Sequence, residues 1–351
     1  MQTALLRHRA VRPLSHVATA LVVSMFLRRA LALGSLLTAA LVLAVGVGAA
    51  GVPIATVLDV FAGGGDATAR SIVLELRLPR ALVAILAGGG LALSGAVFQA
   101  LLRNPLAEPY VLGVAGGAAV GAVAGVVFGV ARYAPAAVPL LSLVGALGAI
   151  LLVFRVAQRV GRALDTRVLL LAGVVVAAFF NALILLLLTY ADVESFRSAV
   201  FWMMGSLSGA TWRTVVLLAL YLLPATAILI SQARPLNLLA IGEDTALNLG
   251  TKVERVKVIG YIVASLAVAV AVATCGVIGF IGLIVPHAVR LVWGSDHRVL
   301  LPASFVAGGV FLLLADTTAR TIVAPAELPV GVITALVGVP LFVSLLRRSA
   351  L

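Results

Sequence analysis

Few residues of this chain could perform chemistry, and their spacing matches no catalytic site. The sequence has no G-x-x-x-x-G-K-[ST] phosphate loop, and the GTK at 250–252 is not one. His, Cys, Asp and Glu do not cluster at metal-ligand spacing. His287 follows Pro286 inside an apolar run, where packing or gating is the expected role, and the single cysteine, Cys275, forms no internal disulfide. The sequence therefore predicts no catalytic residue, no metal site and no cofactor.

The elements that would have to position any functional residue are membrane spans. Hydrophobic residues make up 63% of the 351 residues and charged residues 11%, with a mean hydropathy of +1.21. A soluble domain carries roughly 45–50% apolar and about 25% charged residues. The apolar blocks are long and unbroken, whereas strands of a membrane barrel alternate apolar and polar residues. The composition therefore predicts an all-α membrane protein without a soluble domain.

Apolar runs separated by polar residues mark about ten spans of about 20 residues each. The predicted spans are 30–50, 81–101, 110–131, 137–154, 168–190, 213–231, 258–276, 278–293, 299–315 and 330–346. Only Gly276 and Gly279 indicate a turn between the seventh and the eighth. One polytopic domain over 30–351 is expected, preceded by a basic segment, 1–29, which resembles a secretory signal but lacks a clear cleavage site.

The distribution of charge predicts the orientation of the spans. The formal charge is +12, from 25 Lys and Arg against 13 Asp and Glu. If the N-terminus lies inside, eighteen of the basic residues fall in inside segments and the acidic residues divide almost evenly. Because basic loops mark the cytoplasmic side, both termini are expected in the cytoplasm, and no nucleic-acid partner is needed. The seven basic residues predicted outside are Arg70, Arg77, Arg80, Arg132, Arg197, Arg213 and Arg320.

Two inside loops are more than simple connectors. The longest, 234–257, has the pattern of two short amphipathic helices outside the membrane. Glu243 and Asp244 suit the first turn of a helix, and Gly250 suits a helix end. Such helices either lie on the lipid surface or form a docking surface for a cytoplasmic partner. The second loop, 103–109, holds two prolines that stiffen it.

Seven stretches of the chain, in order and with consistent spacing, match the motifs of a known family. They are 76–121 with R-L-P-R and R-N-P-L-A-E-P, 169–174, FWMMGSLSG at 201–209, 234–250, 279–302, LLADTTAR at 313–320, and 327–346. On these motifs the chain resembles the FecCD-type permeases, which are the membrane subunits of ABC importers for vitamin B12, haem and ferric siderophores. The first 30 residues match no motif of the family.

This resemblance implies a type II ABC importer permease fold with ten spans in the inner (cytoplasmic) cell membrane. The implied assembly is a homodimer with the translocation path at its two-fold axis, two cytoplasmic ATPase subunits, and one soluble or lipid-anchored substrate-binding protein. The implied substrate is an iron chelate, either haem or a ferric siderophore, or a corrinoid, with a cobalamin-specific importer as the alternative. The alternative from a different class is an ion-coupled secondary transporter. Such a transporter would need ionisable residues at the middle of the membrane, and few ionisable residues fall there.

The resemblance also implies roles for residues at the outer face and in the path. Arg77 and Arg80 of R-L-P-R and Arg320 of A-D-x-x-A-R match arginines that pair with glutamates of the binding protein. Without the motif, an outside arginine would more often hold a lipid headgroup. Asn181, in the fifth span, is expected to line the path.

The remaining implied roles lie on the cytoplasmic side. The gate residues are Asn104, Pro105, Leu106, Asp165 and Thr166. The residues that couple to the ATPase are Leu238, Gly242, Glu243, Asp244, Ala246, Leu247, Leu249 and Gly250. The second gate loop departs from the family pattern, because Asp165 and Arg167 flank Thr166, and this puts its gate role in doubt.

Overall fold

The computed structural model describes residues 16–48, 50–108, 110, 113–134, 136–160 and 166–349, and within them the regular secondary structure is helical. Seven stretches are long and apolar enough to cross a membrane. They lie in α1 (His16–Gly46), in α3 (Ala67–Arg70) with the π-helix η1 (Ser71–Arg77) and α4 (Leu78–Leu101), and in α7 (Ala137–Val160), α8 (Thr166–Thr189), α10 (Trp212–Ser231), α13 (Val253–Cys275) and α15 (His297–Ala319). The shorter apolar helices are α5 (Val114–Val127), α14 (Ile281–Trp293) and α16 (Val330–Ser349).

These helices coincide with the predicted spans, and the all-α prediction is confirmed within the described residues. Helix α1 begins at His16, inside the predicted basic segment, so this helix is longer than the span inside it. The division between the seventh and eighth spans falls at Gly276, which ends α13 with φ +73°. A Cβ there would lie 2.4 Å from the carbonyl oxygen of Trp202, so only glycine allows this turn.

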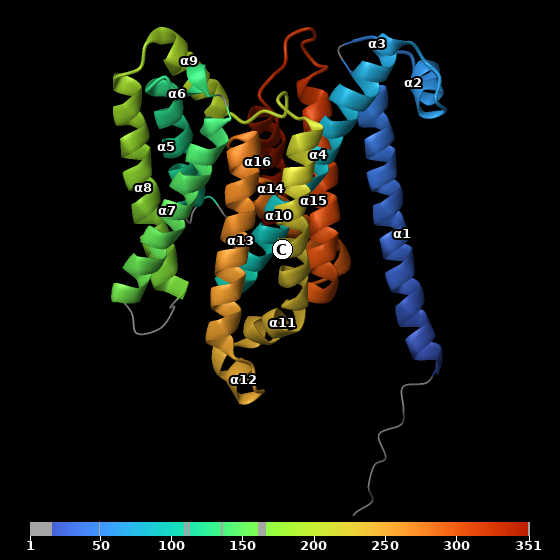
Figure 1. Ribbon diagram of the computed structural model, residues 1–351. Helices are drawn as coiled ribbons and strands as arrows, with labels where there is room; N and C mark the ends of the chain where they lie inside the picture. Colours follow the sequence, from blue (N-terminus) through green and yellow to red (C-terminus); the bar gives the residue numbers. More distant parts are fainter. Residues whose placement is uncertain are drawn as a thin grey trace, which may run out of the picture.

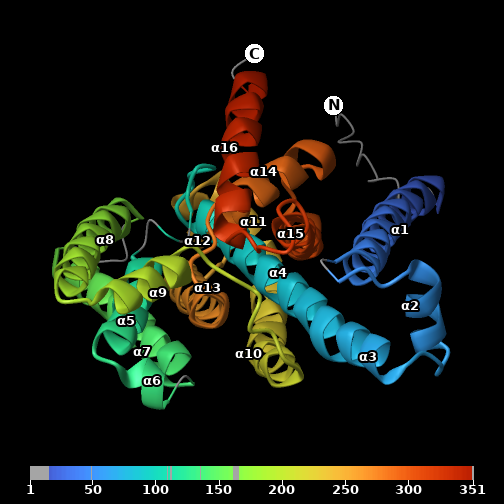
Figure 2. The same ribbon diagram turned by 90° about the horizontal axis from the view of Figure 1, so that it is seen from above.

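Helix α4 forms the centre of the bundle. Seen from above, it runs diagonally, with α10 and α13 on one side and α14, α15 and α16 on the other (Figure 2). It packs closely against α15, α13, α14 and α10. A Cβ on Gly95 would lie 1.9 Å from the carbonyl oxygen of Gly282, so α4 and α14 touch backbone to backbone. Close approach at small residues is how membrane helices associate when the hydrophobic effect does not drive packing.

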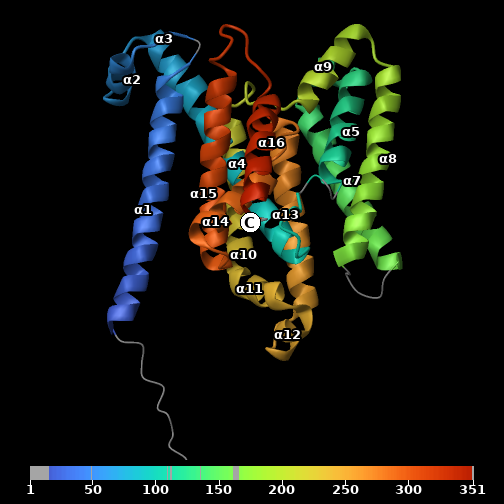
Figure 3. The same ribbon diagram turned by 180° about the vertical axis from the view of Figure 1, so that it is seen from behind.

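Two groups of helices flank this centre. Helix α1 stands at one side of the molecule and packs on α15, while α5, α7 and α8 form a group at the other side (Figures 1 and 3). The two groups therefore present long helical faces to whatever surrounds the chain. Only 17% of the most apolar window of α1 is buried, against 83% for the stretch that ends in α4.

Short helices mark two ends of the bundle. The upper end in Figure 1 carries α2 (Ile54–Phe61), α3, α6 (Val130–Tyr133) and α9 (Val193–Met203), and the lower end carries α11 (Ala233–Ile241) and α12 (Glu243–Asn248). The seven arginines predicted outside all belong to elements at the upper end, whereas the segment 234–257 lies at the lower end. These arginines and the segment 234–257 therefore lie at opposite ends of the bundle.

Candidate functional site

The three arginines predicted to dock a binding protein line one pocket at the upper end, and two of them meet a buried carboxylate. Arg80, in the first turn of α4, donates from Nε and Nη2 to Asp316 of α15 at 2.8–3.1 Å. Its Nη1 reaches both oxygens of Glu327, at 2.9 and 3.0 Å. Asp316 is only 1% exposed, and Arg320 approaches it at 3.8 Å. A buried carboxylate with two arginines holds the start of α4 to the end of α15.

The other two arginines turn toward the end of α1. Arg77 donates to the carbonyl oxygens of Val45 and Gly46, at 2.9 and 3.1 Å. Arg320 donates to the carbonyl oxygen of Ala44. The last carbonyls of a helix lack helical partners and carry its negative dipole end, so cations stabilise them. Both arginines are buried, at 5% and 6% exposure, and they tie α1 to the central helices.

These arginines line a pocket at the upper end. The pocket, which we call the outer pocket, has a volume of about 290 Å³ and is lined by Arg77, Arg80, Arg320 and Glu327 together with residues such as Ser208. From the sequence, these arginines are expected to form an exposed charged surface. The structure instead presents a recessed site, in which much of the positive charge is already paired inside the chain.

The lower end carries the two short helices predicted for 234–257. Leu239 of α11 and Ala246 of α12 are buried and hold the helices to the bundle, whereas three large apolar side chains remain exposed. These are Ile241 at 70%, Leu247 at 55% and Leu249 at 62%. We call these three residues the lower apolar patch. Sequence reasoning missed Ile241, although its position directly before Gly242 ends the helix and exposes it.

Other members of the predicted coupling set have structural positions. Leu238 is half-buried and packs against the core. Gly242 has φ +150° and separates α11 from α12, and Gly250 has φ +80° after α12. Asp244 is exposed in the first turn of α12. The exposed members of the set therefore concentrate on α12 and the residues that follow it.

Glu243 links the predicted coupling helices to the predicted gate loop. Its Oε1 accepts from Arg103 at 3.0 Å, and its Oε2 accepts from Lys257 of α13 at 2.7 Å. Arg103, with φ +45°, is the first residue of the loop after α4. The separation in sequence is 140 residues, so no local pattern could indicate this contact. A displacement of α12 would pull on the loop through this ion pair.

The predicted gate loop is a compact turn. The Oδ1 of Asn104 accepts from the backbone N–H of Leu106 at 2.9 Å, and the carbonyl of Asn104 accepts from Ala107 at 3.0 Å. Pro105 and Leu106 are exposed at the tip. Asp165 and the side chain of Thr166 lie outside the described residues, so the structure places only the first of the two predicted gate segments.

Asn181 lies on an exposed face of α8. The same face carries Val174, Ala178 and Leu185, which are exposed as well. An amide in contact with hydrocarbon would lack hydrogen-bond partners, at a substantial cost in free energy. This face of α8 is therefore suited to a water-filled path or to a protein neighbour.

Among the described residues, the buried histidine of α14 has no cluster of possible metal ligands around it. His287 is buried in α14. Within the part of the chain that the structure describes, no group of three His, Cys, Asp or Glu residues could hold a metal ion.

Comparison with known proteins identifies the family of the chain. A family model described as the FecCD transport family matches residues 36–348. An uncharacterized ABC transporter permease of Bacillus subtilis, YvrB, is 39% identical over 90% of this chain and 92% of its own length. The vitamin B12 import permease BtuC of Salmonella paratyphi A is 43% identical over 79% of this chain and 84% of its own length.

A solved structure extends the comparison to three dimensions. A metal-chelate type ABC transporter in an inward-facing conformation superposes with a TM-score of 0.81 and 33% identity, over 91% of this chain and 98% of that one. PsaBC of Streptococcus pneumoniae, at 16% identity and a TM-score of 0.54, shares the fold.

Proposed function

The chain belongs to the FecCD transport family. From this premise we propose which partner of the importer binds at each end of the bundle. It is the permease of an ABC importer for iron chelates or vitamin B12. It is a transport protein with several membrane spans and not an enzyme. The observation that carries the proposal is that the outer pocket and the lower apolar patch belong to opposite ends of the bundle, whose helices are seen in Figure 1.

The partners follow from the class of transporter. An ABC permease works with an ATPase and a substrate-binding protein. We propose a homodimer of this chain with two ATPase subunits at the lower end and one binding protein at the upper end. We also propose that the lower end and both termini are cytoplasmic, because the basic loops predominate there. In this arrangement ATP hydrolysis occurs in the partner and not in this chain.

The substrate is selected by the partner before it reaches this chain. One relative imports vitamin B12, and a solved neighbour belongs to a metal-chelate transporter. We favour an iron chelate, haem or a ferric siderophore, with cobalamin as the alternative. Titration of the cognate binding protein with haem, ferric siderophores and cobalamin distinguishes them. Selective binding of cobalamin would contradict the iron assignment and leave the class of transporter intact.

We propose that α8 lines the path beside a second copy of the chain. A cysteine replacing Asn181, in a Cys275→Ser background, should react readily with a charged, water-soluble thiol reagent, because this polar face needs water or protein contact. The control is Val216→Cys on α10, which is 64% exposed and lies on a helix outside the proposed path. We expect labelling of the first cysteine at least about tenfold faster. Equal rates in both variants would contradict the proposal.

We propose that the outer pocket receives an acidic side chain of the binding protein. Arg80 already holds Glu327 through Nη1, at a position where Glu327 is 39% exposed. A carboxylate of the partner would compete with Glu327 for this guanidinium. Close charge pairs across an interface couple by about 1.5–7 kcal/mol, so the competition affects the affinity measurably.

This competition predicts that substitutions of Glu327 and Arg80 change the affinity for the binding protein in opposite directions. Glu327→Gln should tighten binding of the partner, because it removes the internal competitor, whereas Arg80→Gln should weaken it by at least about tenfold. Arg132→Gln is the control, since Arg132 forms an exposed pair with Asp192 at 2.9 Å outside the pocket. Binding should occur on right-side-out vesicles and not on inverted ones. Equal losses in all three variants, or binding only to inverted vesicles, would contradict the docking site or its sidedness.

A further inference from the structure

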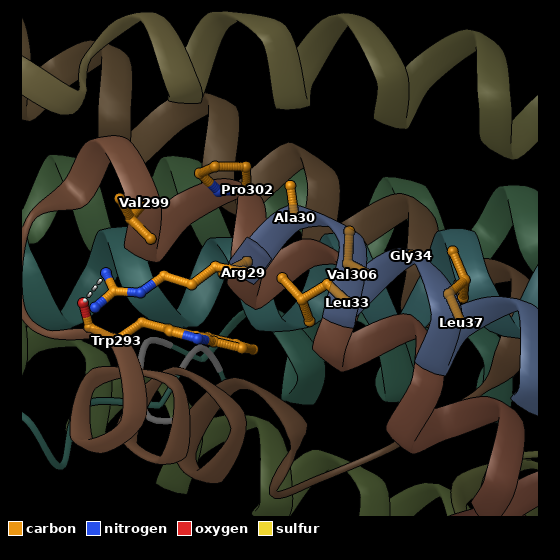
Figure 4. Close-up of a pocket in the computed structure, with 10 residues that line it drawn as sticks. Arg29, Ala30, Leu33, Gly34, Leu37, Trp293, Val299, Pro302 and Val306 are labelled. Carbon is orange, nitrogen blue, oxygen red and sulfur yellow. Dashed lines mark hydrogen bonds between the residues drawn. The ribbon is translucent and has the colours of Figure 1, made fainter. Parts of the chain in front are cut away.

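A groove between α1 and α15 lies at the lower part of the molecule, away from both sites described above. It has a volume of about 230 Å³ and is lined by Leu33, Trp293, Pro302 and Val306, with Arg29 at one end. Figure 4 shows the guanidinium of Arg29 beside Trp293, while Leu33, Val306 and Leu37 follow along the groove. The lining is apolar apart from the arginine.

The guanidinium of Arg29 makes one long hydrogen bond and no ion pair with the described residues. Its Nη1 donates to the carbonyl oxygen of Trp293 at 3.4 Å, and the structure records no other hydrogen bond or ion pair for it among the described residues. The exposed arginines Arg28 and Arg298 add positive charge on α1 and on the first turn of α15. Asp296 hydrogen bonds to Asn237 and to the backbone N–H of Arg298. The end of the groove thus carries a cation available to a phosphate.

The surroundings of the groove indicate what fills it. Arg28 and Arg29 directly precede the apolar run at 30–50, so we place Arg29 near the headgroup level, where arginine and tryptophan are favoured. The side chains of α1 from Leu27 to Leu43 are mostly exposed, so the groove opens to lipid. Basic pockets between membrane helices bind anionic headgroups, and a guanidinium binds phosphate through paired hydrogen bonds.

We propose that this groove is a binding site for an anionic phospholipid, with an acyl chain along Leu33 and Val306 and the phosphate on Arg29. The lipid would fill the space between α1 and α15 and hold α1 against the bundle. This contact differs from the one at the upper end, where Arg77 and Arg320 tie α1 to its neighbours. The proposal does not depend on the identity of the transported substrate.

Native mass spectrometry of the purified full chain, after exchange into mixed phosphatidylglycerol and phosphatidylcholine, tests the site. The wild type should retain phosphatidylglycerol over phosphatidylcholine by about tenfold, and Arg29→Gln should remove this preference. Arg28→Gln is the matched control, because it removes the same charge from an adjacent exposed position. Inorganic phosphate, which lacks an acyl chain, should not displace the lipid. Displacement by phosphate, or equal losses in both variants, would overturn the proposal.

A second pair of variants tests the groove independently of charge. A Cβ on Gly34 meets nothing within 4 Å, so Gly34→Phe should place its ring in the groove and block lipid retention without a clash. Gly148→Phe, on an exposed face of α7 with the same open surroundings, should retain lipid as the wild type does. Retention unaffected by Gly34→Phe would overturn the assignment of the acyl chain to this groove.

Discussion

Replacing Leu247 and Leu249 together with aspartate is expected to abolish co-purification of the ATPase with this chain. Both side chains are exposed, at 55% and 62%, and with Ile241 they form the lower apolar patch. Fully burying a leucine side chain contributes about 1.5–3 kcal/mol, and a buried unpaired carboxylate adds a desolvation penalty. The expected loss of affinity is at least about a thousandfold. Membrane insertion should persist, because neither side chain packs inside the bundle.

A matched pair of substitutions at the opposite end provides the control. Ile322 and Val323, in the loop after α15, are exposed at 64% and 52%. Replacing both with aspartate introduces the same charges and should leave the ATPase bound. If the Leu247 and Leu249 variant retains the ATPase fully, α11 and α12 rest on the lipid surface, and the coupling assignment is wrong.

Replacing Asp316 with alanine is expected to lower the free energy of unfolding by about 3–5 kcal/mol, because it leaves buried arginine charge without its carboxylate. Arg80 donates three hydrogen bonds to Asp316, and Arg320 lies 3.8 Å from it. The measurement is thermal or denaturant unfolding of the chain in lipid nanodiscs. Asp316→Asn, which keeps the shape and one acceptor oxygen, should fall between the wild type and the alanine variant.

The exposed pair at the same end calibrates this effect. Arg132 and Asp192 lie 2.9 Å apart, and both side chains are more than half exposed. The pKa of Asp192 is lowered first by its hydrogen bond from the backbone N–H of Ser195 and to a smaller extent by Arg132. Arg132→Ala should therefore change the stability far less than Asp316→Ala does. Equal effects of the two would show that Asp316 contributes no more than a surface ion pair.

The spans could be predicted from the sequence because their cause is local. A helix in lipid needs about 20 apolar residues in a row, and that requirement is visible in any window of the chain. The two short helices of 234–257 could be predicted for a related reason, since helix ends depend on residues such as Glu243 and Gly250 within one turn. The motifs of the family indicated the positions of the functional segments but not their surroundings.

The surroundings of the outer arginines could not be predicted, because they depend on long-range contacts. Arg80 meets Asp316, which lies 236 residues away, and Arg320 meets the carbonyl of Ala44, 276 residues away. The sequence therefore predicts an exposed docking surface, whereas the structure has a recessed pocket in which the charges of the arginines are partly paired. Ile241 in the lower patch was missed for a similar reason, because exposure of an apolar residue depends on what packs over it.

The sequence by itself determined that this chain is an all-α membrane protein, where its spans lie, and which residues carry its net positive charge. Those properties follow from composition and from the length of apolar runs, which need no partner elsewhere in the chain. Only the tertiary structure decided which of the charges are available. It paired Arg77, Arg80 and Arg320 within the upper end, linked Glu243 to Arg103, and left Arg29 beside an apolar groove. The reason is that a charge in low-dielectric surroundings must find a partner, and the fold determines which partners are near.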